Sequence, residues 1–322
     1  GSRAAHVGLH TMMAGGGVLR VEYARVERCG QRMVTGRYCL HLHYLGHCPE
    51  CVLRGNAIED SSQGGITIHE THDTLVTDNV LWDTRGNGIY VEDGNEMHNV
   101  LSRNVIVCSS AEGCKTDSAI TEAVFASGIY LMGMTNDLID NRVAHWQNTI
   151  FTPGSHHPNG KGGAWGRVCT VHQPFGVWRG QVTHGGLRFG LYLDNQYPRA
   201  LVRDADGYLP TSGVGSNGAP ITDFSSCAEF TPAGGDNGAL CIVEDSLEYH
   251  SMFVGHYTLG DIAFRGFVSV YNLHSMYWKV SKNMVDGTTP HVANAIFADD
   301  TGAGARFAMI GSAVKFYGPA GP

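Results

Sequence analysis

The chain has 322 residues, and its 43% of apolar residues suffices for a sizeable core and excludes a disordered protein. Only 16% of the residues are charged and 43 are glycine, which is typical of short extended segments and tight turns rather than of a helical bundle. The net charge of −8 argues against nucleic-acid binding and against contact with an anionic membrane, and no run of apolar residues is long enough to span a bilayer.

A five-residue motif of alternating apolar and polar residues recurs along the first two thirds of the chain. Clear copies lie at 39–43, 65–69 and 88–92, at offsets of 26 and 23 residues, and weaker copies lie at 128–132 and 190–194. A repeat of about 23 residues is too short for a helix and a return strand, but it holds two or three short strands with their turns. Stacked repeats pair each strand with its counterpart one coil on. The sequence therefore predicts an all-β fold, a parallel β-helix.

Amide side chains recur shortly before most copies of the motif. Amides at one turn position of a β-helix form a ladder that satisfies buried backbone groups coil after coil. We therefore expect a ladder that contains Gln31, Asn56, Asn79, Asn104, Asn141 and Gln181.

Three stretches rich in Gly, Ser, Asp or Pro interrupt the repeat, at residues 108–126, 153–176 and 196–239. Insertions in solenoids usually gather on one side and wall a binding face, which the doublet His156–His157 would then reach. Alternation returns after residue 240, so further coils or a capping sheet are predicted. The first 17 residues lack the apolar stretch of a signal peptide. We expect one domain over residues 1–322, excised from a longer extracellular protein.

The alternation also assigns faces, because successive side chains of a strand point to opposite sides of the sheet. Leu40 and Leu42 begin two inward columns, and the positions between them begin two outward ones. The first outward column is His41, Thr67, Tyr90, Tyr130 and Tyr192, and the second is His43, His69, Glu92, Met132 and Asp194.

The second outward column places imidazoles and carboxylates on successive coils. His43 and His69, with His41 beside them and Glu92 following, match the ligand set of a divalent zinc-type metal ion. The same side chains suit metal-free acid–base catalysis, and stacked like residues are also found on faces that are simply solvated. The candidate metal ligands are His41, His43 and His69, and the candidate catalytic residues are His43, His69, Glu92 and Asp194.

The aromatic residues of the first column predict a strip along the axis on which sugar rings would stack. Tyr90, Tyr130 and Tyr192 form this strip, and His184, which precedes the last clear coil, would approach the same face. These four are the candidate ligand-binding residues. The alternative is that aromatic side chains are simply favoured in strands.

Glycoside hydrolysis needs two carboxyl groups at a set separation. Because adjacent strand residues point to opposite faces, Glu92 is expected to pair with Asp194 or Glu96 rather than with Asp93. Asp93 is expected to cap the turn.

Nine cysteines are a high count for this length. The close pairs Cys48/Cys51, Cys108/Cys114 and Cys227/Cys241 predict disulfides formed in an oxidising compartment, with at least one thiol left over. A zinc site of four cysteines is the alternative.

The order of these motifs resembles the β-helix region shared by cell-surface hyaluronidase, the cell migration-inducing hyaluronan-binding protein and the fibrocystin-like receptors. The resembling stretches are 21–23, 30–31, 38–43, 66–71, 75–80, 83–94 and 136–141, with a weaker one at 182–191. The resemblance implies a right-handed parallel β-helix in an extracellular or cell-surface glycoprotein that contacts a glycosaminoglycan such as hyaluronan and, in some members, depolymerises it. The positions that match the family motif are His41, His43, His69, Glu92 and Asp93.

Two functions are therefore expected as alternatives. The first is an extracellular glycan-binding module that also cleaves its polysaccharide, as a hydrolase or a lyase. The second is a non-catalytic structural or assembly module of a large surface or filamentous glycoprotein, whose partners are the neighbouring domains of the longer chain.

Overall fold

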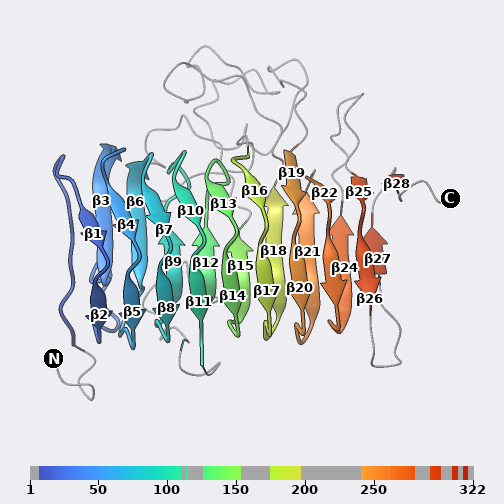
Figure 1. Cartoon of the computed structure of the whole chain (residues 1–322), viewed down its shortest axis with the longest axis horizontal. Coiled ribbons are helices and arrows are strands. Elements are labelled where there is room, and N and C mark those ends of the chain that lie inside the picture. The colour runs from blue at the N-terminus through green and yellow to red at the C-terminus, as the bar shows by residue number, and fades with distance from the viewer. Residues whose placement is uncertain are drawn as a thin grey trace, which may run out of the picture.

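The computed structural model describes residues 7–109, 114, 126–153, 175–196, 241–260, 262–279, 291–298, 307–310 and 315–317. These residues form β-strands that stack along one axis from the N-terminal to the C-terminal end (Figure 1). No helix long and apolar enough to cross a membrane occurs in this part of the chain. The stacking confirms the predicted parallel β-helix.

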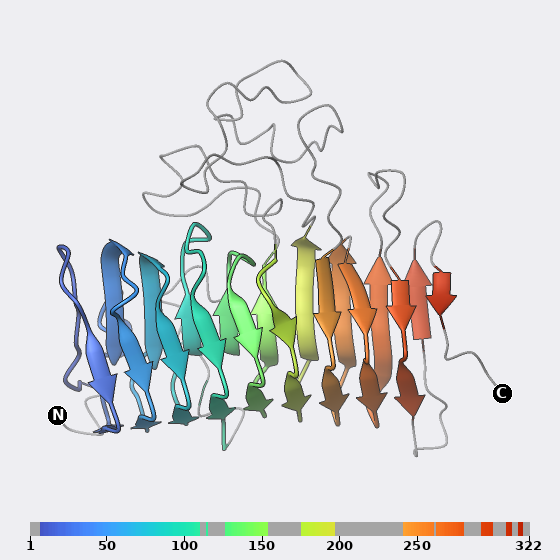
Figure 2. The same ribbon diagram turned by 45° about the horizontal axis from the view of Figure 1, so that its top comes forward.

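The strands form three parallel sheets, and consecutive strands along the chain pass from one sheet to the next (Figure 2). The first sheet contains, in order, β1 (Arg20–Glu22), β4 (Val52–Arg54), β7 (Leu75–Thr77), β10 (Val100–Ser102), β13 (Asp137–Ile139), β16 (Trp178–Arg179), β19 (Cys241–Glu244), β22 (Ile262–Arg265), β25 (His291–Ala293) and β28 (Lys315–Tyr317). The second contains β2 (Arg25–Glu27), β5 (Ala57–Glu59), β8 (Val80–Trp82), β11 (Val105–Val107), β14 (Arg142–Ala144), β17 (Val182–His184), β20 (Leu247–Tyr249), β23 (Val268–Val270) and β26 (Ile296–Ala298). The third contains β3 (Leu40–His47), β6 (Ile66–His72), β9 (Asn87–Val91), β12 (Ser127–Leu131), β15 (Asn148–Thr152), β18 (Phe189–Gln196), β21 (Val254–Gly260), β24 (His274–Lys279) and β27 (Phe307–Ile310).

The core is the interior of the solenoid, and the predicted inward columns lie in it. Leu40 pairs with Ile66, which pairs with Ile89, and all three are buried. One coil was missed by the sequence analysis, because Asn148–Thr152 does not repeat the glycine of the motif. This strand, β15, lies between β12 and β18, so Phe151 separates Tyr130 from Tyr192 in their column.

The predicted amide ladder occupies the corner between the first and second sheets. Each side-chain Nδ2 donates to the Oδ1 of the next asparagine at 3.0 Å, from Asn56 to Asn79, Asn104 and Asn141, and Asn141 donates to Gln181 at 3.1 Å. Gln31 is not a member. A second ladder, which the sequence analysis missed, runs from Thr74 through Asn99 to Asn136.

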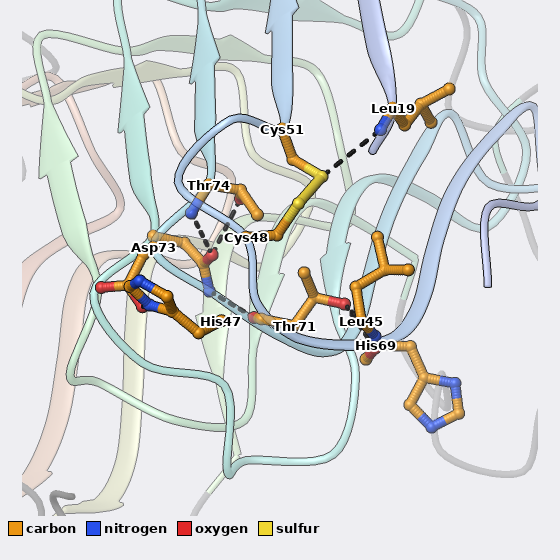
Figure 3. The surroundings of a disulfide bond; sticks show 10 residues. Leu19, Leu45, His47, Cys48, Cys51, His69, Thr71, Asp73 and Thr74 are labelled. Atoms are coloured by element: carbon orange, nitrogen blue, oxygen red, sulfur yellow. Dashed lines mark hydrogen bonds and ion pairs between the residues drawn. A yellow bond between two sulfur atoms is a disulfide. The ribbon is translucent and has the colours of Figure 1, made fainter. Parts of the chain in front are cut away.

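Two predicted disulfides are present, Cys48–Cys51 and Cys108–Cys114, and a third that was not predicted joins Cys29 to Cys39. These six residues are therefore not zinc ligands. The backbone N–H of Leu19 donates to Sγ of Cys51, which ties the first coil to the second (Figure 3). Cys241 is buried in β19, whereas Cys227 lies outside the described residues.

Candidate functional site

The first outward column is buried, so it does not form an exposed aromatic strip. His41, Tyr90 and Tyr130 are each 1% exposed, and only Tyr192 is half-buried. The rings pack against one another along the axis, with centroids 5.0 Å apart for Tyr90 and Tyr130 and 4.8 Å apart for Phe151 and Tyr192. The expectation that sugar rings stack on Tyr90 and Tyr130 is therefore wrong, because their faces are occupied by neighbouring side chains.

The second outward column brings two histidines together at the start of the solenoid. His43 and His69 are register partners on β3 and β6, and their Nδ1 atoms are 3.0 Å apart. Nε2 of His69 lies 2.9 Å from Oδ2 of Asp93, and its Nδ1 lies 3.5 Å from Oε2 of Glu92. The predicted turn-capping role of Asp93 is thus replaced by a contact with His69. Strict alternation ends with β9 at Val91, so the next two side chains both reach the same imidazole.

Tyr44 joins the cluster and was not predicted. Its ring centroid is 4.4 Å from that of His43 and 4.5 Å from that of His69. It sits in a β-bulge, because the pairing of β3 with β6 shifts by one residue between His43 and Gly46, and its φ is 54°. Bulges re-aim side chains and are frequent beside functional sites. Gly46 within a strand pattern was the signal that could have revealed the bulge.

Buried carboxyl groups surround this cluster and set its charge. Glu96 is fully buried and accepts backbone hydrogen bonds from Glu70, Asp93 and Gly94 at 2.8–3.1 Å. Burial and the charge of Asp93 raise the pKa of Glu96 to about 7, although those hydrogen bonds oppose the shift. Burial together with the neighbouring carboxylates, of which Glu70 acts most strongly, raises the pKa of Tyr44 to about 12.

His69 is the cationic member of the cluster. Burial alone would lower its pKa, but the hydrogen bond to Asp93 and the charges of Glu92 and Asp93 raise the pKa to about 9. A protonated His69 donates one N–H to Asp93 and the other to Nδ1 of His43. His43 is then the tautomer whose proton is on Nε2. The cluster can therefore present an imidazole N–H backed by a cation and a carboxylate, which is the arrangement of a proton donor.

His41 lies beneath the pair and, unlike His69, is neutral. Its Nδ1 is 3.1 Å from the carbonyl oxygen of Gly36, and its ring centroid is 4.9 Å from that of His43. Burial and the neighbouring His43 lower the pKa of His41 to about 3, so this imidazole is neutral. One ring nitrogen from each of His41, His43 and His69 lies within 4.8 Å of the others.

Two predicted site residues lie elsewhere. Asp194 is on β18, three coil steps from Glu92, which is roughly 14 Å at the spacing of paired strands. That exceeds the separation of hydrolytic carboxyl pairs, and Asp194 instead accepts a hydrogen bond from the Tyr192 hydroxyl at 3.2 Å. His184 is on β17 of the second sheet and stacks on Tyr249 with centroids 4.7 Å apart. His156 and His157 lie outside the described residues.

The amino-acid sequence is similar to a known β-helix family and to several known proteins. Residues 6–191 match the family described as the CEMIP beta-helix, which is more than half of the chain. Human fibrocystin-L is 30% identical over 181 residues, or 55% of this chain and 4% of that protein. Human cell surface hyaluronidase CEMIP2 is 23% identical over 205 residues, and the human cell migration-inducing and hyaluronan-binding protein is 24% identical over 204. The chain covers 15% of each of these two, so it spans a small part of its relatives.

Proposed function

Because the chain belongs to the CEMIP beta-helix family, we propose that it is an extracellular module that binds a polysaccharide at the cluster of His43, Tyr44, His69, Glu92 and Asp93. The observation that carries this proposal is the hydrogen-bonded series His43–His69–Asp93 on the outer face of the first three coils. Two relatives are named for hyaluronan binding or hyaluronidase activity. The three disulfides support an oxidising, extracellular compartment.

The cluster supplies one cationic imidazole and one further imidazole N–H, and the carboxylates of Glu92 and Asp93 offset the charge of the cation. His69 carries a positive charge at neutral pH, because its pKa is about 9. Both N–H groups of His69 are directed to Asp93 and His43, so the donor for a sugar hydroxyl or carboxylate is Nε2–H of His43, polarised by the cation behind it. Cleavage would use a relay, in which Nε2–H of His43 protonates the glycosidic oxygen while Nδ1 of His43 takes the proton of the His69 cation, so that both imidazoles end neutral.

A structural module is the second candidate function. The first amide ladder links successive coils from Asn56 to Gln181, and the aromatic column does so from Tyr90 to Tyr192, as a rigid spacer would need. Human fibrocystin-L, of which this chain spans 4%, shows that such a β-helix occurs as a small element of a very large protein. A stiff spacer between neighbouring domains needs no accessible polar cluster, so the two functions predict different effects of substitution at His43 and His69.

The test is binding and depolymerisation of hyaluronan, chondroitin and alginate by the wild-type chain and by the double variant His43→Ala/His69→Ala. His184→Ala is the matched control, because His184 is a half-buried imidazole on another sheet. We expect the double variant to lose binding while its circular dichroism spectrum and that of the control stay unchanged. Equal behaviour of the wild type and the double variant, or no binding by either, would assign the structural function instead.

A further inference from the structure

We propose that His41, His43 and His69 form a binding site for one divalent zinc-type metal ion. The site lies within the cluster of the proposed function. Only the role of the metal in polysaccharide binding rests on that proposed function. The binding of the ion itself follows from the three imidazoles, so it is tested without any polysaccharide.

The first step of the argument is the orientation of His41. A backbone carbonyl oxygen can only accept a hydrogen bond, so the contact between Nδ1 and Gly36 places the proton of His41 on Nδ1. Nε2 then carries a lone pair. This atom is buried, and among the described residues no hydrogen-bond donor reaches it. A buried lone pair without a partner is costly, and a metal ion would satisfy it.

The second step is the spacing of the three ring nitrogens. Zinc bonds imidazole nitrogen at about 2.0–2.1 Å, which in a tetrahedral site separates two ligand nitrogens by roughly 3.4 Å. Nδ1 of His43 and Nδ1 of His69 are already 3.0 Å apart. One ring nitrogen from each of the three histidines lies within 4.8 Å of the other two. Small rotations of the rings would therefore complete the set, with the metal in place of the proton that His43 and His69 share.

The third step is the set of groups behind the ligands. Metal-binding histidines usually donate their second N–H to a carboxylate or a backbone carbonyl, which fixes the tautomer and the ring. His69 has Asp93 in this position at 2.9 Å, and His41 has the carbonyl of Gly36. Glu92 and Glu96 add negative charge close by, which favours a dication.

Three protein ligands leave one coordination position open, as in catalytic rather than structural zinc sites. His43 and His69 are half-buried, so this position is reached from the solvent side of the third sheet. A bound water or a sugar oxygen could occupy it. The cluster would then meet the polysaccharide through a metal as well as through hydrogen bonds.

The test is calorimetric titration of the chelator-stripped full chain with Zn²⁺, together with the visible absorption spectrum of the Co²⁺ form. We expect one saturable equivalent and the intense bands of a four-coordinate ion. His41→Phe, which keeps a planar ring at this position but has no ligand atom, should abolish the tight equivalent. Asp93→Asn should weaken it by about 10–100-fold, as is usual for groups behind metal ligands.

The control is the double variant His47→Ala/His98→Ala, which removes two exposed imidazoles that flank Asp73 outside the cluster. It should bind Zn²⁺ as the wild type does. No saturable binding by the wild type, or tight binding that survives His41→Phe, would overturn the metal site, and so would loss of binding in the control. Polysaccharide binding that persists in the metal-free chain would leave the proposed function standing without it.

Discussion

Nδ1 of His43 and Nδ1 of His69 lie 3.0 Å apart, although the two residues are 26 positions apart in the sequence. The contact exists because β3 and β6 pair in parallel with these two residues in register. Two imidazole nitrogens can approach this closely only when one of them carries a proton. The carboxylates of Asp93 and Glu92 raise the pKa of His69 to about 9, so at neutral pH His69 holds this proton in addition to the one that it donates to Asp93.

Replacement of Asp93 by asparagine should therefore lower the pKa of His69. The loss of a contacting negative charge removes the interaction that outweighs burial, and we expect the pKa to fall from about 9 by about 1–2 units. The measurement is an NMR titration of the histidine resonances of metal-free protein. Asp73→Asn is the control, because Asp73 contacts His47 rather than His69. An unchanged pKa of His69 in Asp93→Asn would refute the assignment of the proton.

The stability of the metal-free protein should also depend on His69 in one pH window. Its pKa is about 9 in the folded chain and about 6.5 in the unfolded chain, so folding favours the protonated form. The resulting stabilisation, on the order of 2–3 kcal/mol, is fully present below about pH 6.5 and is lost as the pH rises through 9. The pKa of His41 is lowered to about 3, so this residue reduces the stability of the fold only as the pH falls below about 6.5.

The measurement is the free energy of unfolding of the wild type and of His69→Asn at the two ends of this window. The difference between the two proteins should shrink by the stated amount as the pH rises. A difference that stays constant, or grows, would show that His69 is neutral in the folded chain.

The sequence predicted the parts of the structure that repeat. The spacing of the motif copies fixed the register, and therefore the inward columns, the first amide ladder and the meeting of His43 with His69. What escaped prediction depends on departures from the repeat. The bulge at Tyr44 and the end of β9 before Glu92 break the alternation, and β15 lacks the motif glycine. The burial of Tyr90 depends on packing across coils, which a one-coil motif does not contain.

The first amide ladder should be most sensitive at its centre. Asn104 donates to Asn141 and to the carbonyl of Val76 and accepts from the backbone N–H of Asn79. Asn104→Ala leaves several of these buried groups without a partner, so we expect a loss of about 3 kcal/mol in the free energy of unfolding. Gln31→Ala, at the amide that lies outside the ladder, should cost less than about 1 kcal/mol. Equal losses in urea denaturation would contradict the ladder as a stabilising element.

A buried polar pair interrupts the apolar interior near the C-terminal end. His256 and Glu248 are 0% and 1% exposed, and Nδ1 of His256 lies 3.1 Å from Oε1 of Glu248. Burial lowers the pKa of His256 to about 3 and raises that of Glu248 well above its usual range. Both groups are therefore neutral, and the carboxyl O–H donates to the imidazole.

The neighbouring coils show what the interior accepts at these positions. His256 is paired between Leu191 and Met276, and Glu248 lies between Thr183 and Ser269. His256→Leu alone leaves the carboxyl group buried without its partner and should cost about 1–3 kcal/mol. Adding Glu248→Thr removes that orphaned group, so the double variant should be at least as stable as the wild type. Urea denaturation of the wild type, both single variants and the double variant measures the coupling. A double variant less stable than His256→Leu would show that the pair stabilises this coil beyond its own hydrogen bond.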